Sequence, residues 1–129
     1  MEERLVKVGI THGDINGIGY EVILKTLSDT RITELCTPVI YGSSKIAAYH
    51  RKALELPAVN LSIIAQAEDA GVNRVNIINC VDDETEVELC QSTTVAGEAA
   101  YLALEAAVTD LKRGAVDVLV TAPINKHNI

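Results

Sequence analysis

The fold is decided by residues 10–21, which read Ile10-Thr11-His12-Gly13-Asp14-Ile15-Asn16-Gly17-Ile18-Gly19-Tyr20-Glu21. They join an apolar run with strand-like alternation, residues 5–11, to a helix-like run, residues 19–27. Glycine lacks a Cβ atom, so its backbone can approach a ligand closely and can adopt a positive φ. A helix that starts behind such a turn offers free N–H donors and a partial positive charge. The segment therefore predicts a strand–turn–helix unit whose turn suits a polar or phosphorylated ligand.

The composition predicts one domain with an aliphatic core. The chain has 129 residues and is 48% hydrophobic, yet it contains four tyrosines and no Phe or Trp. Val, Ile, Leu and Ala must fill such a core, which is typical of a parallel sheet covered by helices. The net charge of −7 argues against a nucleic acid or a membrane surface as partner. A local anion site stays compatible with that charge, because backbone N–H groups and one lysine suffice.

The cysteines and histidines show no metal-binding pattern. The residues concerned are Cys36, Cys80, Cys90, His12, His50 and His127. The odd number of cysteines without C-x-x-C spacing indicates buried free thiols in a reducing cytoplasm. The histidines share no ligand spacing, and the cluster His50-Arg51-Lys52 predicts a solvated helix face. We expect no metal site within the chain and a cytoplasmic location, since neither a signal peptide nor a transmembrane segment is visible.

Strand and helix patterns alternate along the chain. Strands are predicted at residues 5–11, 38–41, 61–65, 73–79 and 116–120, and helices at residues 19–27, 43–54 and 93–113. The predicted buried faces comprise Val22, Ile23 and Leu27 in the first helix and Val95, Ala99, Leu102 and Ala106 in the last. This order predicts a three-layer α/β/α fold with a mostly parallel sheet. A mixed sheet is the alternative, because no helix pattern separates the strands between residues 60 and 79.

A second turn follows the last predicted strand and reads Thr121-Ala122-Pro123-Ile124-Asn125-Lys126. Pro123 stiffens it, Thr121 presents a hydroxyl, and Lys126 supplies a mobile cation of the kind that holds a phosphate or a carboxylate. A surface lysine at the start of a helix is an equally open interpretation. Ligands of open α/β sheets bind beyond the carboxyl ends of the strands, so we expect the two turns to converge along one rim.

Structural roles compete with ligand contact in the first turn. The spacing of Gly13, Gly17 and Gly19 is not the G-x-G-x-x-G dinucleotide fingerprint, and on spacing alone a tight structural turn is favoured. Asp14 can accept a hydrogen bond from a substrate hydroxyl or cap the turn, and capping is the commoner use. His12 can act as a general base or be a solvated or hydrogen-bonded bystander, and the bystander role is favoured.

The two turns together resemble motifs of the 4-hydroxythreonine-4-phosphate dehydrogenase family of pyridoxal phosphate biosynthesis. The matching residues are Ile10-Thr11-x-Gly13-Asp14-x-x-Gly17-Ile18-Gly19-x-Glu21 and Leu119-Val120-Thr121-Ala122-Pro123-Ile124-Asn125-Lys126, with Gly97, Glu105 and Ala106 of the alanine-rich helix between them. The resemblance covers the whole chain. Its second motif is specific, whereas the first is shared loosely with isocitrate and isopropylmalate dehydrogenases. His12 and Ile15 stand where many family members have other residues.

The resemblance implies an NAD-dependent, metal-dependent oxidation of 4-phosphooxy-threonine, followed by decarboxylation. It implies the wider fold of the isocitrate and isopropylmalate dehydrogenases and a homodimer with its site in a cleft between two domains. Thr121, Lys126 and Asp14 would then contact substrate, and the three glycines of the first turn would shape the cleft. The divalent metal's ligands are expected downstream of residue 129. Residues 1–129 are then the N-terminal portion of the enzyme, inactive alone.

Two other functions stay open at this stage. One is a stand-alone α/β module that binds a phosphorylated metabolite without chemistry, which tight, metal-independent binding by the isolated chain would favour. The other is a β-decarboxylating dehydrogenase of the isocitrate or isopropylmalate type. The motif at residues 121–126 argues against the latter.

Overall fold

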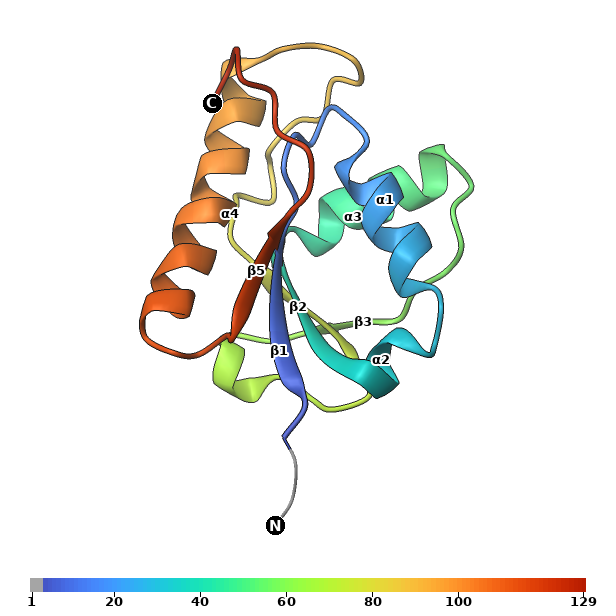
Figure 1. Cartoon of the computed structure of the whole chain (residues 1–129). Helices are drawn as coiled ribbons and strands as arrows, with labels where there is room; N and C mark the ends of the chain where they lie inside the picture. The colour runs from blue at the N-terminus through green and yellow to red at the C-terminus, as the bar shows by residue number, and fades with distance from the viewer. Residues whose placement is uncertain (1–3) are drawn as a thin grey trace.

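A five-stranded sheet with every strand parallel forms the centre of the computed structural model, which describes residues 4–129 (Figure 1). The strand order is β3-β4-β2-β1-β5. The strands are β1 (Val6–Thr11), β2 (Cys36–Gly42), β3 (Leu61–Ile63), β4 (Val75–Asn79) and β5 (Val118–Thr121). The helices are α1 (Gly19–Leu27), α2 (Ile32–Leu35), α3 (Ser44–Ala53), the short 3₁₀ helix η1 (Ala67–Asp69) and α4 (Thr94–Lys112).

Helices cover both faces of the sheet, with α1 and α3 on one side and α4 on the other (Figure 1). Successive residues of a strand point to opposite faces, and β2 shows this clearly. Ile40 packs in one apolar cluster with Ile23 of α1, whereas Val39 and Tyr41 pack in another with Ala103 of α4. The predicted three-layer α/β/α fold is therefore confirmed.

The alternative of a mixed sheet was wrong. β3 and β4 are parallel neighbours, with Leu61 opposite Val75 and Ile63 opposite Ile77. A parallel pair needs a crossover connection, usually a long helix. Residues 64–74 make this crossover with only the three-residue helix η1, which is too short to produce a helical pattern in the sequence. The four-residue helix α2 was missed for the same reason.

Small residues form the buried face of α4, so the predicted face was right at Ala99, which is buried, and at Ala106, which is partly buried, and wrong at Val95 and Leu102. The buried residues are Ala96, Gly97, Ala99, Ala100, Ala103 and Ala107. Val95 and Leu102 are instead 46% and 45% exposed. The hydrophobic pattern misled because it gives large side chains more weight than alanine, whereas α4 meets the sheet through alanine. Val22 of α1 was also misassigned and is 45% exposed, whereas Ile23 and Leu27 are buried as predicted.

Side-chain hydroxyls cap the starts of α3 and α4. The Ser43 hydroxyl accepts a hydrogen bond from the Ile46 N–H at 3.2 Å, and the Thr93 hydroxyl accepts one from the Ala96 N–H at 3.1 Å. Gly114 lies just beyond the end of α4, and its positive φ of +79° stops the helix there. Within residues 4–129, no helix combines the length and the apolar character that crossing a membrane requires.

The expectation of buried thiols holds only in part. Cys36 and Cys80 are half-buried and Cys90 is exposed, and all three are free. Burial raises the pKa of the Cys80 thiol to about 11, so this group stays protonated and unreactive at neutral pH.

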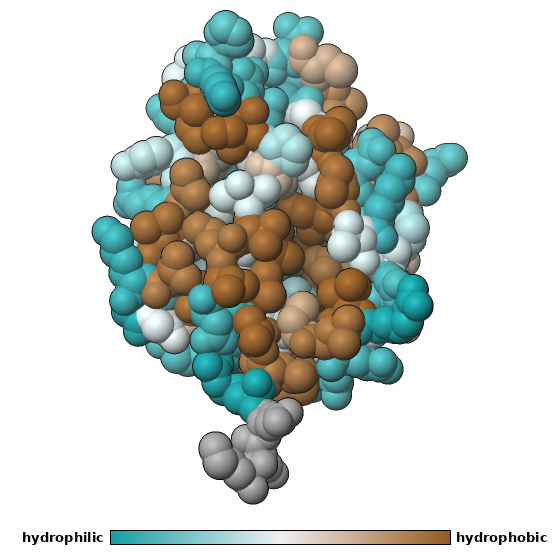
Figure 2. Space-filling view, in the orientation of Figure 1, coloured by the Kyte–Doolittle hydropathy of each residue, from teal (hydrophilic) through white to brown (hydrophobic). Residues whose placement is uncertain are grey.

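The edge of the sheet that β5 forms is apolar. β5 pairs with β1 on one side, and Val118 and Val120 on it are 44% and 52% exposed. Figure 2 shows a hydrophobic surface over this side of the molecule, in the region where β5 lies between α1 and α4 in Figure 1. An edge strand of this kind is a ready template for further pairing.

Candidate active-site rim

The two predicted turns meet. Thr11 at the end of β1 lies opposite Thr121 at the end of β5, so the two chains leave the same edge of the sheet side by side. The Ala122 N–H donates to the Thr11 carbonyl at 3.0 Å, and the Asp14 N–H donates to the Pro123 carbonyl at 2.9 Å. The predicted convergence is confirmed, and residues 12–19 and 121–126 together are called the rim below.

Two of the three glycines are required by close backbone packing within the rim. Gly13 has a φ of +65°, and a Cβ atom there would overlap the carbonyl oxygens of Ala122 and Pro123. A Cβ atom on Gly19 would overlap the carbonyl oxygen of His12. At Gly17 the added atom would lie 3.2 Å from an Asp14 carboxylate oxygen, a contact that a small shift relieves. Packing thus explains Gly13 and Gly19 whichever ligand the rim binds.

Asp14 caps the turn from within. Its Oδ1 accepts a hydrogen bond from the Asn16 N–H at 3.0 Å, and its carbonyl accepts one from the Gly17 N–H at 3.1 Å. The structure thus shows the structural role that the sequence favoured. A contact from Asp14 to substrate remains a prediction.

Lys126 starts a hydrogen-bonded turn beyond Pro123. The Asn125 side chain accepts from the His127 N–H at 2.9 Å, and the Asn125 carbonyl accepts from the Asn128 N–H at 3.3 Å. Both Lys126 and Thr121 are exposed. Lys126 takes part in none of the ion pairs found among residues 4–129, so its ammonium group is available to a ligand.

Asn16 connects the rim to the segment that starts α4, which the sequence did not reveal. Its amide donates to the Gln91 carbonyl at 3.0 Å and to the Thr93 hydroxyl at 3.2 Å, and its Oδ1 accepts from the Glu88 N–H at 2.8 Å. The side chain is almost fully buried. An amide with both donors and its acceptor satisfied stiffens the glycine turn.

His50 was predicted on a solvated face, and this was wrong. It is fully buried, and its Nε2–H donates to the Ile15 carbonyl in the middle of the glycine turn at 2.6 Å. The spacing of His50 from Ile46 and Ala47, the other buried residues of α3, is the helical signal that could have identified it. The other two residues of that cluster, Arg51 and Lys52, are exposed as predicted.

His12 is a hydrogen-bonded residue, as one of the two bystander interpretations predicted, and it is buried and not solvated. Its Nε2 lies 3.0 Å from the Ala99 carbonyl oxygen and its Nδ1 lies 2.9 Å from the Tyr20 hydroxyl. Both ring nitrogens are therefore engaged within the protein, which argues against a general-base role.

Burial makes the protein's stability pH-dependent through these two histidines. Desolvation lowers the pKa of His12 and of His50 below the ordinary value of 6.5. As the pH falls below 6.5, the unfolded chain binds protons that the folded chain resists, so the free energy of unfolding decreases. We expect a slope of up to about 1.4 kcal/mol per pH unit for each histidine in that window. Urea unfolding measured between about pH 7.5 and pH 5 checks it.

The exposed His127 provides the control for this measurement. A His127→Asn variant should retain the full slope, whereas a His50→Gln variant should lose part of it. Hydrogen bonds from a neighbouring arginine lower the pKa values of Asp29 and Glu68 to about 2. The stability that these two carboxylates contribute to the folded protein is therefore lost mainly at pH values below the chosen window. A flat profile between pH 7.5 and pH 5 would contradict the prediction.

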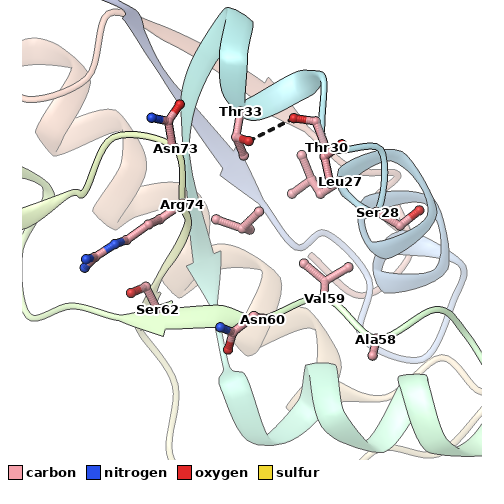
Figure 3. A pocket seen from close by; sticks show the side chains of 11 residues that line it. Leu27, Ser28, Thr30, Thr33, Ala58, Val59, Asn60, Ser62, Asn73 and Arg74 are labelled. Carbon is pink, nitrogen blue, oxygen red and sulfur yellow. Dashed lines mark hydrogen bonds between the residues drawn. The ribbon is translucent and has the colours of Figure 1, made fainter.

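The described residues do not assemble a metal site. Within residues 4–129, no three His, Cys, Asp or Glu side chains come together in a group that could hold a metal ion. A hollow of about 440 Å³ lies at the other end of the strands, beside the start of β4 and the end of α1 (Figure 3). Asn60, Ser62, Asn73 and the self-contained pair Thr30–Thr33 line it, so it belongs to neither predicted turn.

Several known proteins are similar to this chain. A family model described as "Pyridoxal phosphate biosynthetic protein PdxA" matches residues 34–129. The chain is 58% identical over 129 residues to a 4-hydroxythreonine-4-phosphate dehydrogenase of Bacteroides thetaiotaomicron, covering all of this chain and 35% of that protein. It is 36% identical over 125 residues to the enzyme of that name from Sulfurihydrogenibium, covering 95% of this chain and 37% of that protein.

Solved structures agree with this. The chain superimposes on a 4-hydroxythreonine-4-phosphate dehydrogenase from Burkholderia phymatum with a TM-score of 0.85 and 28% identity, covering 98% of this chain and 38% of that one. The enzyme from Klebsiella pneumoniae also gives 0.85, with 25% identity and 95% and 38% coverage. The chain thus spans little more than a third of the length of the relatives that it matches. On the extent of the family match, this chain belongs to the family of the pyridoxal phosphate biosynthetic protein PdxA.

Proposed function

We propose that this chain forms one wall of the active-site cleft of an NAD-dependent 4-hydroxythreonine-4-phosphate dehydrogenase. The observation that carries the proposal is the hydrogen bond from the Asp14 N–H to the Pro123 carbonyl, which joins the glycine turn to the turn of Lys126. In this rim the Lys126 side chain is exposed and forms none of the ion pairs found among residues 4–129, and a cation of this kind suits a phosphate or carboxylate. The 58% identity to an enzyme of that name supports the assignment.

The proposed reaction begins with oxidation of the substrate's C3 alcohol. The carbon loses a hydride and the oxygen loses its proton, so a ketone forms next to the carbon that bears the carboxylate. The carbon–carboxylate bond then breaks, CO₂ leaves, and the remaining electron pair takes up a proton to give an amino-ketone phosphate. Thr121, Lys126 and Asp14 are assigned to holding the substrate, and Gly13, Gly17 and Gly19 to shaping the floor beneath it.

The proposal includes NAD as the hydride acceptor and a divalent metal ion because the family resemblance implies both. Residues 4–129 do not fit the metal by themselves, since they assemble no ligand group. The proposal therefore assigns the metal ligands to the part of the enzyme beyond this chain, and places the enzyme in the cytoplasm as a homodimer. What these residues contribute is the orientation of the phosphorylated hydroxy acid.

A chimeric enzyme tests this function. Residues 1–129 replace the matching part of the Bacteroides thetaiotaomicron relative, and NADH formation is followed with 4-hydroxythreonine 4-phosphate and a divalent metal. We expect the chimera to be active, and the 129-residue chain and the remaining part of the relative each to be inactive alone. An inactive, folded chimera would refute the proposal, as would NAD reduction by the 129-residue chain alone.

The substrate within the family is decided in the same assay. A 30% identical relative from Clostridium botulinum carries a name that gives D-threonate 4-phosphate as its substrate. The two compounds share a four-carbon hydroxy acid with a terminal phosphate and differ at C2. The higher identity to the 4-hydroxythreonine-4-phosphate enzyme favours the amino compound, so kcat/KM should be greater for it than for D-threonate 4-phosphate.

A further inference from the structure

We propose that His12 and Tyr20 are positioning residues, which form a buried clasp that holds the glycine turn in the shape that binds substrate. This inference rests on the proposed function, because it assigns to the pair the alignment of a turn that contacts the phosphorylated substrate. The two residues flank the turn directly, one before Gly13 and one after Gly19. Their side chains meet beneath it, with 2.9 Å between His12 Nδ1 and the Tyr20 hydroxyl oxygen.

The direction of each hydrogen bond in the clasp follows from its partners. The Ala99 carbonyl can only accept a hydrogen bond. His12 Nε2 therefore carries a proton and donates it in the hydrogen bond to this carbonyl, at 3.0 Å. In the neutral imidazole Nδ1 is then an acceptor, and the Tyr20 hydroxyl donates to it at 2.9 Å rather than to the more distant Ser43 carbonyl oxygen at 3.3 Å. The Tyr20 oxygen accepts in turn from the Ser43 N–H at 2.8 Å. Burial raises the pKa of the Tyr20 hydroxyl, which keeps this donor protonated.

This chain of bonds fixes the turn relative to two helices. Ala99 lies in the second turn of α4, and Ser43 is the residue that caps α3. The clasp therefore joins both ends of the glycine turn to each other and to the start of α3 and the body of α4. His50 supports it from α3, because its ring stacks on Tyr20 at 5.6 Å and its Nε2–H reaches the Ile15 carbonyl.

Gly42 leaves the space that this pair occupies. A Cβ atom on Gly42 would overlap the Tyr20 hydroxyl and lie 2.7 Å from His12 Nδ1. His12 and Tyr20 are both fully buried. A hydroxyl and an imidazole removed from water need partners, and the bond between them joins the two ends of the turn. Removal of the Tyr20 hydroxyl leaves His12 Nδ1 without its donor and the Ser43 N–H without its acceptor, which loosens the turn.

The kinetic test uses Tyr20→Phe in the chimera, with Tyr49→Phe as the matched control. Tyr49 lies on α3, is 45% exposed, and its hydroxyl makes no hydrogen bond to residues 4–129 that would be lost. We expect Tyr20→Phe to raise KM for the phosphorylated substrate about tenfold with kcat within about twofold, because a loosened turn binds less well while the chemistry is unchanged. Tyr49→Phe should leave both constants unchanged. An unchanged KM in Tyr20→Phe, or a loss confined to kcat, would overturn the proposal.

Two substitutions of His12 separate the clasp from simple packing. An asparagine can place its oxygen near the position of Nδ1, so His12→Asn retains the acceptor for Tyr20. A glutamine reaches the position of Nε2 instead, so His12→Gln retains the donor to Ala99 and loses the clasp. We expect KM to rise in His12→Gln and to recover in His12→Asn. Equal kinetics in the two variants would count against the clasp.

Hydrogen exchange decides the matter independently of activity. In the 129-residue chain, the amides of Asp14 and Gly17 should exchange about tenfold faster in Tyr20→Phe than in Tyr49→Phe, while those of β4 do not change. Unchanged protection of Asp14 and Gly17 would refute the clasp even in an active enzyme. A chimera that is inactive before any substitution refutes the proposed function instead, and the exchange result then decides the clasp alone.

Discussion

Replacing Gly13 by alanine is expected to lower the free energy of unfolding of the chain by about 2–4 kcal/mol. Two costs combine at this position. The φ of +65° is unfavourable for a residue with a Cβ atom, and the added carbon would meet the carbonyl oxygen of Ala122 at 2.7 Å and overlap that of Pro123. Both neighbours are backbone atoms of the second turn, so no side-chain rotation can relieve the overlap. Urea unfolding followed by circular dichroism measures the change.

Gly114→Ala is the matched control for that experiment. Gly114 has a similar φ of +79°, but nothing lies within 4 Å of an added Cβ atom. The substitution therefore carries the conformational cost alone, which is about 1 kcal/mol. If Gly13→Ala were no more destabilising than Gly114→Ala, the two turns could not be packed as closely as described.

Lys126→Ala in the chimera is expected to lower kcat/KM about 100-fold, mainly through KM. The reason is that the Lys126 ammonium is the cation proposed to meet the phosphate or carboxylate of the substrate. Loss of a charge-assisted hydrogen bond to a desolvated anion removes up to about 3 kcal/mol of binding. Steady-state kinetics with the phosphorylated substrate, at two salt concentrations, measures the effect.

Lys52→Ala on the exposed face of α3 is the control for charge. It removes the same positive charge from the surface without touching the rim. Kinetic constants of Lys126→Ala that match those of Lys52→Ala would show that the Thr121–Lys126 turn does not hold the anion. Lys126→Arg should recover part of the loss, because it restores the charge but not its position.

Much of the fold was predictable because its local signals agree. The alternation in β1, the glycines behind it and the start of α1 all indicate one strand–turn–helix unit, and it was found where predicted. The meeting of the two turns followed from a general property of parallel sheets, since the carboxyl ends of all strands share one edge. The substrate contacts of Thr121, Lys126 and Asp14 stay predictions, because they depend on a ligand.

What escaped prediction depends on contacts between distant segments. Nothing near Asn16 in the sequence shows that residues 88–93 return to its amide, and nothing near His12 indicates the carbonyl of Ala99. The direction of β3 was undetermined because the connection to β4 contains no long helix. The support of the rim is thus a property of the tertiary structure, although its turns are visible locally.

The alanine-lined contact between α4 and the sheet sets an unusual rule for variation in this protein. Ala103 and Ala107 are fully inaccessible, and a backbone carbonyl of the C-terminal turn occupies the space beside Gly97. Most cores are damaged when a side chain is trimmed, because a void remains. The side chains on the inner face of α4 are already small, so enlargement is the damaging change. A single added methyl group pushes the helix away from the strands, together with the carbonyl that accepts a hydrogen bond from His12. Natural or engineered substitutions should therefore be tolerated on the outward face of α4 and not on its alanine-lined inner face.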